Sequence, residues 1–144
     1  MLGARPGGLM AAVGMFVCLF ASSVSASIVA RVDLSNQRIS VIVNGSHYAS
    51  WPISSGRGRY ATPVGSFRPQ SLKRMHYSSK YYNSPMPYSV FFHRGYAIHG
   101  TNYLRQLGRP ASHGCIRLHP SNAAALFNLI REYGMRNTRI TITQ

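Results

Sequence analysis

Turn residues divide most of this chain into short runs rich in β-branched and aromatic residues, a pattern typical of a sheet protein. The strongest turn signal is the pair Asn44-Gly45, which favours a two-residue hairpin between two such runs. Strands are predicted over residues 28–34, 38–43, 46–53, 66–68, 88–93, 96–99, 115–118 and 138–143. The fold is therefore predicted to be mostly β.

One segment has a helical period instead. Pro120 suits the first position of a helix, and Gly134 suits a C-terminal cap. The apolar residues between them recur at the spacing of a helix that packs on a core. They are Leu126, Leu129, Ile130 and Tyr133. We predict one main α-helix, from Pro120 through Tyr133.

The segment from Gln70 to Pro87 has neither period. It contains two prolines and several Tyr and Ser residues. A long loop inside a compact domain usually has a function, often as a lid. We therefore predict a long lid loop here.

The first 26 residues have the features of a secretory signal peptide. Arg5 is their only charged residue, an apolar run follows from Leu9 to Ala21, and Val24-Ser25-Ala26 has small residues where a signal peptidase reads. The run is too short for a spanning helix, which needs about 20 residues. We predict a signal peptide over residues 1–26, cleavage after Ala26, a single domain over residues 27–144, and no stable membrane anchor after cleavage.

A lipoprotein is the alternative interpretation of the same segment, with Cys18 as the lipidated residue. The residue before it is Val17, where a small residue is expected. Cleavage after Ala26 would remove Cys18 and leave Cys115 as the single cysteine. An unpaired cysteine in an exported protein is a candidate reactive thiol. The alternatives for Cys115 are an inert buried thiol and an intermolecular bridge.

Basic residues greatly outnumber acidic ones. Sixteen Lys and Arg face only two acids, Asp33 and Glu132, and the net charge is +14. Such a charge implies an anionic partner, which is nucleic acid, acidic lipid or a carboxylate-rich wall polymer. Export argues against nucleic acid, so we expect anionic envelope polymers. The alternative is that the charge only maintains solubility. Two acids are also too few for a carboxylate-rich metal site. A glycosidase usually needs a pair of carboxylates close together, whereas Asp33 lies on a predicted strand and Glu132 near the end of a predicted helix.

The histidines and the cysteine carry the clearest chemical signal. A free thiol is mostly protonated near neutral pH, and only the thiolate attacks well. A neighbouring imidazole activates it by taking the proton. His113 lies two residues before Cys115, and His99 ends a predicted strand from which it would face Cys115. We favour His99 as the base, with His113 as the alternative.

Two further interpretations concern the same stretch. Gly114 beside the thiol lets a substrate approach the backbone, whose N–H groups stabilise an oxyanion; a simple tight turn explains it equally well. A zinc site is the competing use of the ligand-type side chains, although their spacing matches none of the usual patterns. Those side chains are His99, His113, Cys115 and His119.

The run Ser112-His113-Gly114-Cys115-Ile116-Arg117-Leu118, with His99-Gly100 upstream, resembles the signature of the L,D-transpeptidase (YkuD-type) catalytic domain. Some members have serine after the first histidine, where this chain has Gly100. The resemblance covers essentially all of residues 27–144. Its other matching blocks are Val32-Asp33-Leu34-Ser35, Gln37-Arg38, Trp51-Pro52 to Gly56, Thr62-Pro63-Val64-Gly65-Ser66-Phe67 and Met86-Pro87-Tyr88.

This resemblance implies a YkuD-like β-sandwich with one main helix and a lid over the substrate groove. It implies Cys115 as the nucleophile and His99 as the proton donor and acceptor, with His113 and Gly114 shaping the site and its oxyanion hole. We expect substrate contacts from Arg117, a charged fork for a carboxylate, and from two residues in matching blocks. These two residues are Ser112 and Tyr88. No cofactor and no metal are expected.

The implied reaction is acylation of Cys115 by the third residue of a donor tetrapeptide stem, release of D-Ala, and transfer to an acceptor amine in a 3-3 cross-link. Peptidoglycan stem peptides are the implied partners, in the bacterial periplasm or cell envelope. Hydrolysis or amino-acid exchange is the alternative within the family. The alternative from another class is a non-enzymatic basic envelope protein that binds anionic polymer.

Overall fold

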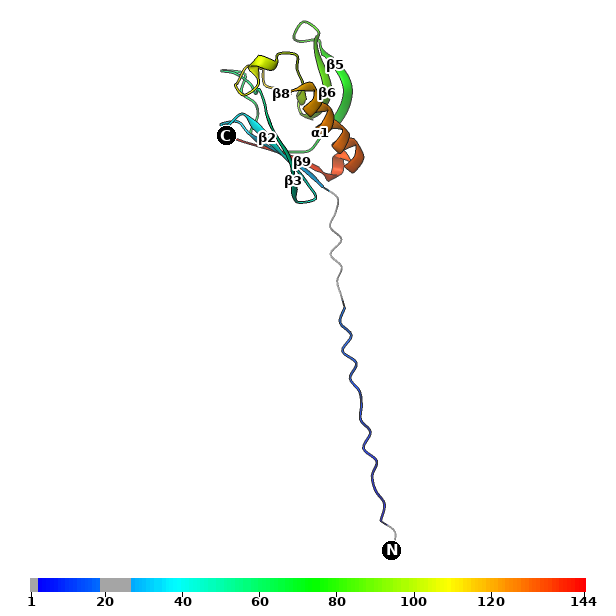
Figure 1. Ribbon diagram of the computed structural model, residues 1–144. Helices are drawn as coiled ribbons and strands as arrows, with labels where there is room; N and C mark the ends of the chain where they lie inside the picture. The colour runs from blue at the N-terminus through cyan, green and yellow to red at the C-terminus, as the bar shows by residue number, and fades with distance from the viewer. Residues whose placement is uncertain (1–2, 19–26) are drawn as a thin grey trace.

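Two β-sheets and one α-helix make up the chain from residue 27 onward in the computed structural model, which describes residues 3–18 and 27–144 (Figure 1). Residues 3–18 are exposed and form neither helix nor strand. No helix among the described residues has the length and apolar character needed to cross a membrane. The predicted cleavage site after Ala26 lies outside the described residues, so cleavage stays a prediction.

The first sheet has five strands in the order β3-β2-β1-β9-β4. Their bounds are Ser46–Pro52 for β3, Arg38–Val43 for β2, Ile28–Asp33 for β1, Thr138–Thr143 for β9 and Gly65–Phe67 for β4. β1 and β9 pair in parallel, and the other neighbours are antiparallel. Asn44 and Gly45 have φ of 49° and 80°, the positive values that the predicted hairpin turn requires.

The second sheet has four strands in the order β5-β6-β7-β8. Their bounds are Ser71–Ser78 for β5, Ser84–His93 for β6, Tyr96–Gly100 for β7 and Ile116–Leu118 for β8. β7 and β8 are parallel neighbours, with Ile98 opposite Ile116 and His99 opposite Arg117. This pair brings together the two segments that carry the motif.

The long loop predicted over residues 70–87 is wrong. Most of this segment is strand β5 and the first half of β6, which pair as an antiparallel hairpin with His76 opposite Met86. Several β5 side chains in succession are exposed, because the hairpin extends beyond the core. An extended strand without a buried face has no apolar alternation, so its pattern resembles that of a loop.

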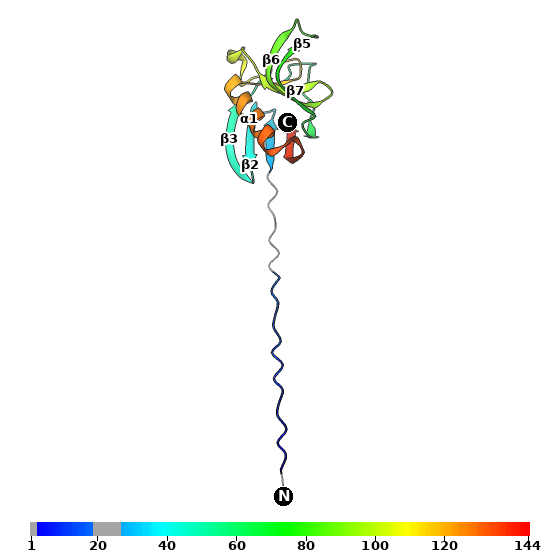
Figure 2. The same ribbon diagram turned by 90° about the vertical axis from the view of Figure 1, so that its right-hand side faces the viewer.

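Helix α1, Pro120–Tyr133, packs against β6 and β7 and touches β1 of the other sheet (Figure 2). Its buried side chains join those of both sheets in one apolar cluster: Ala123, Leu126, Phe127 and Ile130. Gly134 caps its end with φ of 96° and donates its N–H to Ile130 O. Two short 3-10 helices, Leu104–Gln106 and Met135–Asn137, complete the elements. The predicted fold class, mostly β with one main helix, is confirmed.

Candidate active site

Cys115 lies immediately before β8, and His99 lies on the neighbouring strand β7. Ile116 and Leu118 are fully buried in the core, so the alternate residues Cys115 and Arg117 project from the opposite face of the strand. His99 is opposite Arg117 in the parallel register and therefore projects from that same face. The pairing of β7 with β8 thus places the three side chains together.

All three side chains line a cavity of about 950 Å³. Its wall is completed by the β5–β6 hairpin, by the β6–β7 turn and by the loop that contains Leu104–Gln106. Ser112 and His113 also line it. A volume of this size accommodates a short peptide segment.

His99 is held as a neutral imidazole in one tautomer. It is 6% exposed, and its Nδ1 lies 2.7 Å from the carbonyl oxygen of Gly100. A carbonyl oxygen only accepts, so Nδ1 carries the proton and Nε2 has a free lone pair. Burial, with smaller contributions from the nearby charges of Arg117 and His76, lowers the pKa of His99 to about 4 despite the opposing effect of the Gly100 carbonyl. A proton acceptor is therefore available at neutral pH.

Cys115 is half-buried, and burial raises the pKa of its thiol. The backbone of Ala97 and the positive charge of Arg117 act in the opposite direction. The resting pair is therefore a protonated thiol beside a neutral imidazole. In this arrangement the thiol keeps its proton at rest, and the neutral imidazole is the group able to accept it.

The turn before Cys115 is fixed by buried hydrogen bonds. The Ser112 hydroxyl donates to Cys115 O at 2.6 Å and accepts from the Gly114 N–H at 3.0 Å. Thr62 Oγ1 donates to Gly114 O at 2.8 Å. Gly114 has φ of 120°, and a Cβ there would collide with the ring of Tyr96, so only glycine fits. The Gly114 N–H is therefore engaged within the turn by the Ser112 hydroxyl.

His113 is packed between two tyrosines. The ring of Tyr81, in the connection between β5 and β6, stacks on it at 4.3 Å between centroids and 9° between planes. Tyr60 contacts it edge-on at 4.7 Å. His113 thereby links the turn before Cys115 to the β5–β6 hairpin. The sequence analysis did not identify either tyrosine, because residues more than 30 positions away give no local signal.

Arg117 is half-buried and faces the cavity. Its Nη1 donates to Gln106 Oε1 at 3.1 Å, and its guanidinium lies 5.6 Å from the centre of the Tyr103 ring. Its backbone N–H and carbonyl both bond to Ser54. Burial lowers the pKa of Arg117, while the nearby Cys115 raises it. The guanidinium keeps its charge and retains donors for a ligand.

The lining of the cavity is strongly cationic. Of the described residues that line it, none is Asp or Glu, and four are basic. The four are Arg57, Lys80, Arg94 and Arg117. This composition suits a ligand that carries several carboxylates.

Two residues named as candidates from the sequence, Tyr88 for substrate contact and His119 for zinc binding, lie outside the lining of this cavity. Tyr88 is not among the residues that line the cavity, and its ring packs edge-on against Phe127 of α1 at 5.5 Å, so the substrate contact expected of it stays a prediction. Its φ of 53° interrupts the alternation along β6. His119 accepts the Ser121 N–H with Nδ1 at the start of α1, and the described residues contain no group of three metal-ligand side chains. Among the described residues, the side chains of the zinc alternative are therefore not gathered into one ligand set.

The two packed sheets, the single helix and the histidine-cysteine cavity define the L,D-transpeptidase class of catalytic domain. The chain belongs to this family, YkuD, whose sequence pattern matches residues 27–142. A Bacillus subtilis (strain 168) protein that carries the family name YkuD is 26% identical over 117 residues, which are 78% of this chain and 64% of that protein.

Solved structures of L,D-transpeptidases have the same fold. One from Mycobacterium tuberculosis H37Rv is 26% identical with a TM-score of 0.75 over 83% of this chain and 58% of that chain. One from Xylanimonas cellulosilytica DSM 15894 is 28% identical with a TM-score of 0.70 over 83% and 61%. LdtMt1 in complex with imipenem is 26% identical with a TM-score of 0.73 over 82% and 59%. The chain spans less than two thirds of the length of each of these relatives.

Proposed function

We propose that this protein is a peptidoglycan L,D-transpeptidase with Cys115 as its nucleophile and His99 as its proton acceptor and donor. The observation that supports this most is the fixed tautomer of His99, whose Nδ1–H is bound to Gly100 O. Its free Nε2 is then turned away from the backbone, on the strand face that also carries Cys115. Both side chains line one cavity.

The proposed reaction has two halves. Cys115 Sγ attacks the carbonyl carbon of the third residue of a donor tetrapeptide stem while its proton passes to His99 Nε2. The bond to D-Ala breaks, the leaving amine takes that proton, and a thioester remains. An acceptor amine then attacks the thioester carbonyl and gives its extra proton to His99 Nε2. The bond from carbon to Cys115 Sγ breaks, the sulfur takes that proton from His99, and the product contains a 3-3 cross-link.

The turn before Cys115 is proposed to stabilise the oxyanion. Gly114 contributes by its shape rather than by its N–H, which already donates to Ser112 Oγ. We assign the donor role to the backbone N–H of Cys115 itself, whose position the Ser112 hydroxyl fixes through Cys115 O. Ser112 is therefore proposed to position the turn, with a direct contact to the stem as its second role.

The cationic lining supports a stem-peptide donor, since such stems carry several carboxylates. Arg117 is proposed to bind one of them beside the reacting carbonyl. Anionic envelope polymers are proposed as further partners of the basic surface, and the periplasm or cell envelope as its location after cleavage at Ala26. The alternatives remain hydrolysis or exchange at the same site, and a non-enzymatic polymer-binding protein.

The experiment is incubation of residues 27–144 with purified disaccharide-tetrapeptides, followed by mass spectrometry of the products. A cross-linked dimer with loss of D-Ala is expected. Tripeptide alone indicates hydrolysis, and incorporation of an added D-amino acid indicates exchange. No turnover, with polymer binding that survives in Cys115→Ala, would favour the non-enzymatic alternative.

A further inference from the structure

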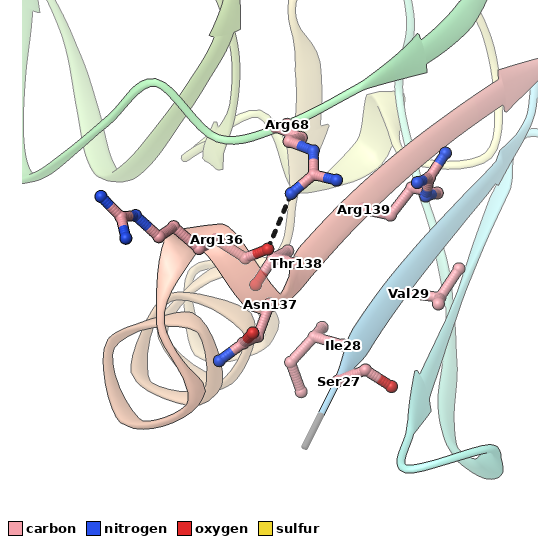
Figure 3. Close-up of a pocket in the computed structure, with 8 residues that line it drawn as sticks. All are labelled: Ser27, Ile28, Val29, Arg68, Arg136, Asn137, Thr138 and Arg139. Atoms are coloured by element: carbon pink, nitrogen blue, oxygen red, sulfur yellow. Dashed lines mark hydrogen bonds between the residues drawn. The ribbon is translucent and has the colours of Figure 1, made fainter. Parts of the chain in front are cut away.

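A second, smaller cavity lies at the other end of the domain, where β1 begins (Figure 3). Its volume is about 230 Å³, and it shares no lining residue with the cavity of Cys115. It lies between the start of β1, the end of β4 and the start of β9. In both ribbon views this end of the domain is opposite the β5–β6 hairpin (Figures 1 and 2).

Two guanidinium groups face this cavity and are held by neutral partners. Arg68 Nη1 donates to the carbonyl oxygen of Arg136 at 2.9 Å, and Arg139 Nη1 donates to Ser66 Oγ at 3.2 Å. Figure 3 shows both guanidinium heads on one side of the cavity, while the side chain of Arg136 points away from it. Each guanidinium has five N–H donors, so most of them remain free for a ligand.

No carboxylate neutralises this pair. Neither acid of the sequence lines the cavity, and Asp33, at the far end of β1, accepts hydrogen bonds from Asn36 instead. One guanidinium suffices for a planar carboxylate, whereas two that reach in from different strands suit the several oxygens of a tetrahedral phosphate. A phosphate group is therefore the ligand chemistry that this cavity fits.

The position of the cavity selects the source of that phosphate. Ser27, the first described residue of the domain, lines it, and the apolar run from Leu9 to Ala21 precedes Ser27 closely in the chain. Because this run is close to Ser27 in the chain, a membrane that held the run before the predicted cleavage would be next to this end of the domain. We propose that Arg68 and Arg139 bind the phosphate of an anionic phospholipid headgroup and hold the domain on the membrane surface, with the Cys115 cavity directed away from it.

The test is flotation of residues 27–144 with vesicles of phosphatidylglycerol and phosphatidylcholine. Residues 27–144 contain every described residue of the buried hydrophobic core, so the apolar contacts that stabilise the folded domain are retained. The variant Arg68→Gln/Arg139→Gln is expected to lose about 10- to 30-fold in vesicle partitioning, since each basic side chain near such a surface contributes about a factor of five. Thermal unfolding of each variant confirms that it is folded.

Arg105→Gln/Arg109→Gln is the charge-matched control, because both side chains are exposed and neither lines a cavity. Vesicle partitioning of this control is expected to fall less than threefold. The variant Arg68→Lys/Arg139→Lys is expected to retain only part of the vesicle binding of the parent protein. Equal losses in the two Gln pairs would show attraction by net charge alone and overturn the site. Binding of inorganic phosphate is measured separately by calorimetry. If phosphate binding requires both arginines but vesicle binding does not, the cavity binds phosphate from another source, and the proposed membrane contact is overturned.

Discussion

His99 and Cys115 are both kept uncharged by the burial that brings them together. The lowered pKa of His99 leaves Nε2 free to accept a proton, and the raised pKa of Cys115 keeps the proton on sulfur in the resting protein. His113 is closer in sequence, yet its ring is stacked on Tyr81 and serves as a packing surface. The two histidines should therefore respond differently to substitution.

His99→Ala should slow acylation of Cys115 by small thiol reagents about 10²- to 10⁴-fold, because general-base help is worth about that much. His113→Ala should slow it far less, since it removes packing and no proton acceptor. Rates of adduct formation, followed by intact mass at fixed pH, measure both. Equal losses in the two variants would mean that the base is wrongly assigned.

Arg117→Ala should lower kcat/KM for a donor stem about 10- to 150-fold, the effect of losing a charge-assisted contact of about 1.5 to 3 kcal/mol. Arg117→Lys should recover only part, because a point charge does not form the two-pronged contact. A thiol reagent without carboxylates is the comparison, and its rate should fall much less. If neither rate changes in folded Arg117→Ala, the residue is structural.

Among the elements, the β5–β6 hairpin forms part of the wall of the cavity that Cys115 lines. Its connection carries Tyr81, which stacks on His113, and Lys80, which also lines the cavity. The stack of Tyr81 on His113 connects the hairpin to the turn before Cys115, so we expect it to fix the position of the hairpin relative to Cys115. This is a positioning role, separate from proton transfer.

Tyr81→Ala should slow turnover of a donor stem about 3- to 10-fold, which corresponds to an aromatic contact of about 0.5 to 1.5 kcal/mol. Tyr81→Phe should restore it, because the stack needs the ring and not the hydroxyl. Tyr77→Ala is the control from the same hairpin, with a side chain that is 57% exposed. A similar loss in Tyr77→Ala, or no rescue by Phe, would contradict the positioning role.

The elements that sequence predicts well are those with one buried face. β1 alternates buried Ile28, Ala30 and Val32 with more exposed residues, and α1 has its apolar stripe, so their patterns reveal them. The hairpin over residues 71–93 was missed in its first half because β5 has no buried face. The prediction that His99 and Cys115 act together rests on the resemblance of the motif to the family signature, whereas the Tyr60–His113–Tyr81 contacts depend on long-range packing that no local pattern encodes.

For the whole molecule, the scarcity of acids makes histidine the main group that titrates between pH 7.5 and 4.5. Burial lowers the pKa of His99 to about 4, below the value near 6.5 that it has when unfolded. The unfolded chain therefore binds the proton more tightly, and folding stability falls as the pH falls through this range. The pKa of His113 is lowered too, which acts in the same direction.

The free energy of unfolding should thus decrease by about 2 to 3 kcal/mol between pH 7.5 and 4.5 through His99 alone. Urea unfolding at both pH values measures this, and His99→Gln should remove most of the difference. An unchanged stability in the parent protein, or an equal decrease in His99→Gln, would show that His99 is not held neutral by burial.

The central claim is that Cys115 forms the acyl-enzyme, and a carbapenem tests it most directly because its strained lactam traps the thiolate. The fold of LdtMt1 in complex with imipenem resembles this one, which makes imipenem the reagent to use. Intact mass after incubation of residues 27–144 with imipenem should increase by one adduct, and peptide mapping should place it on Cys115. Cys115→Ala should form none. An unmodified parent protein, or an adduct that persists in Cys115→Ala, would contradict the account.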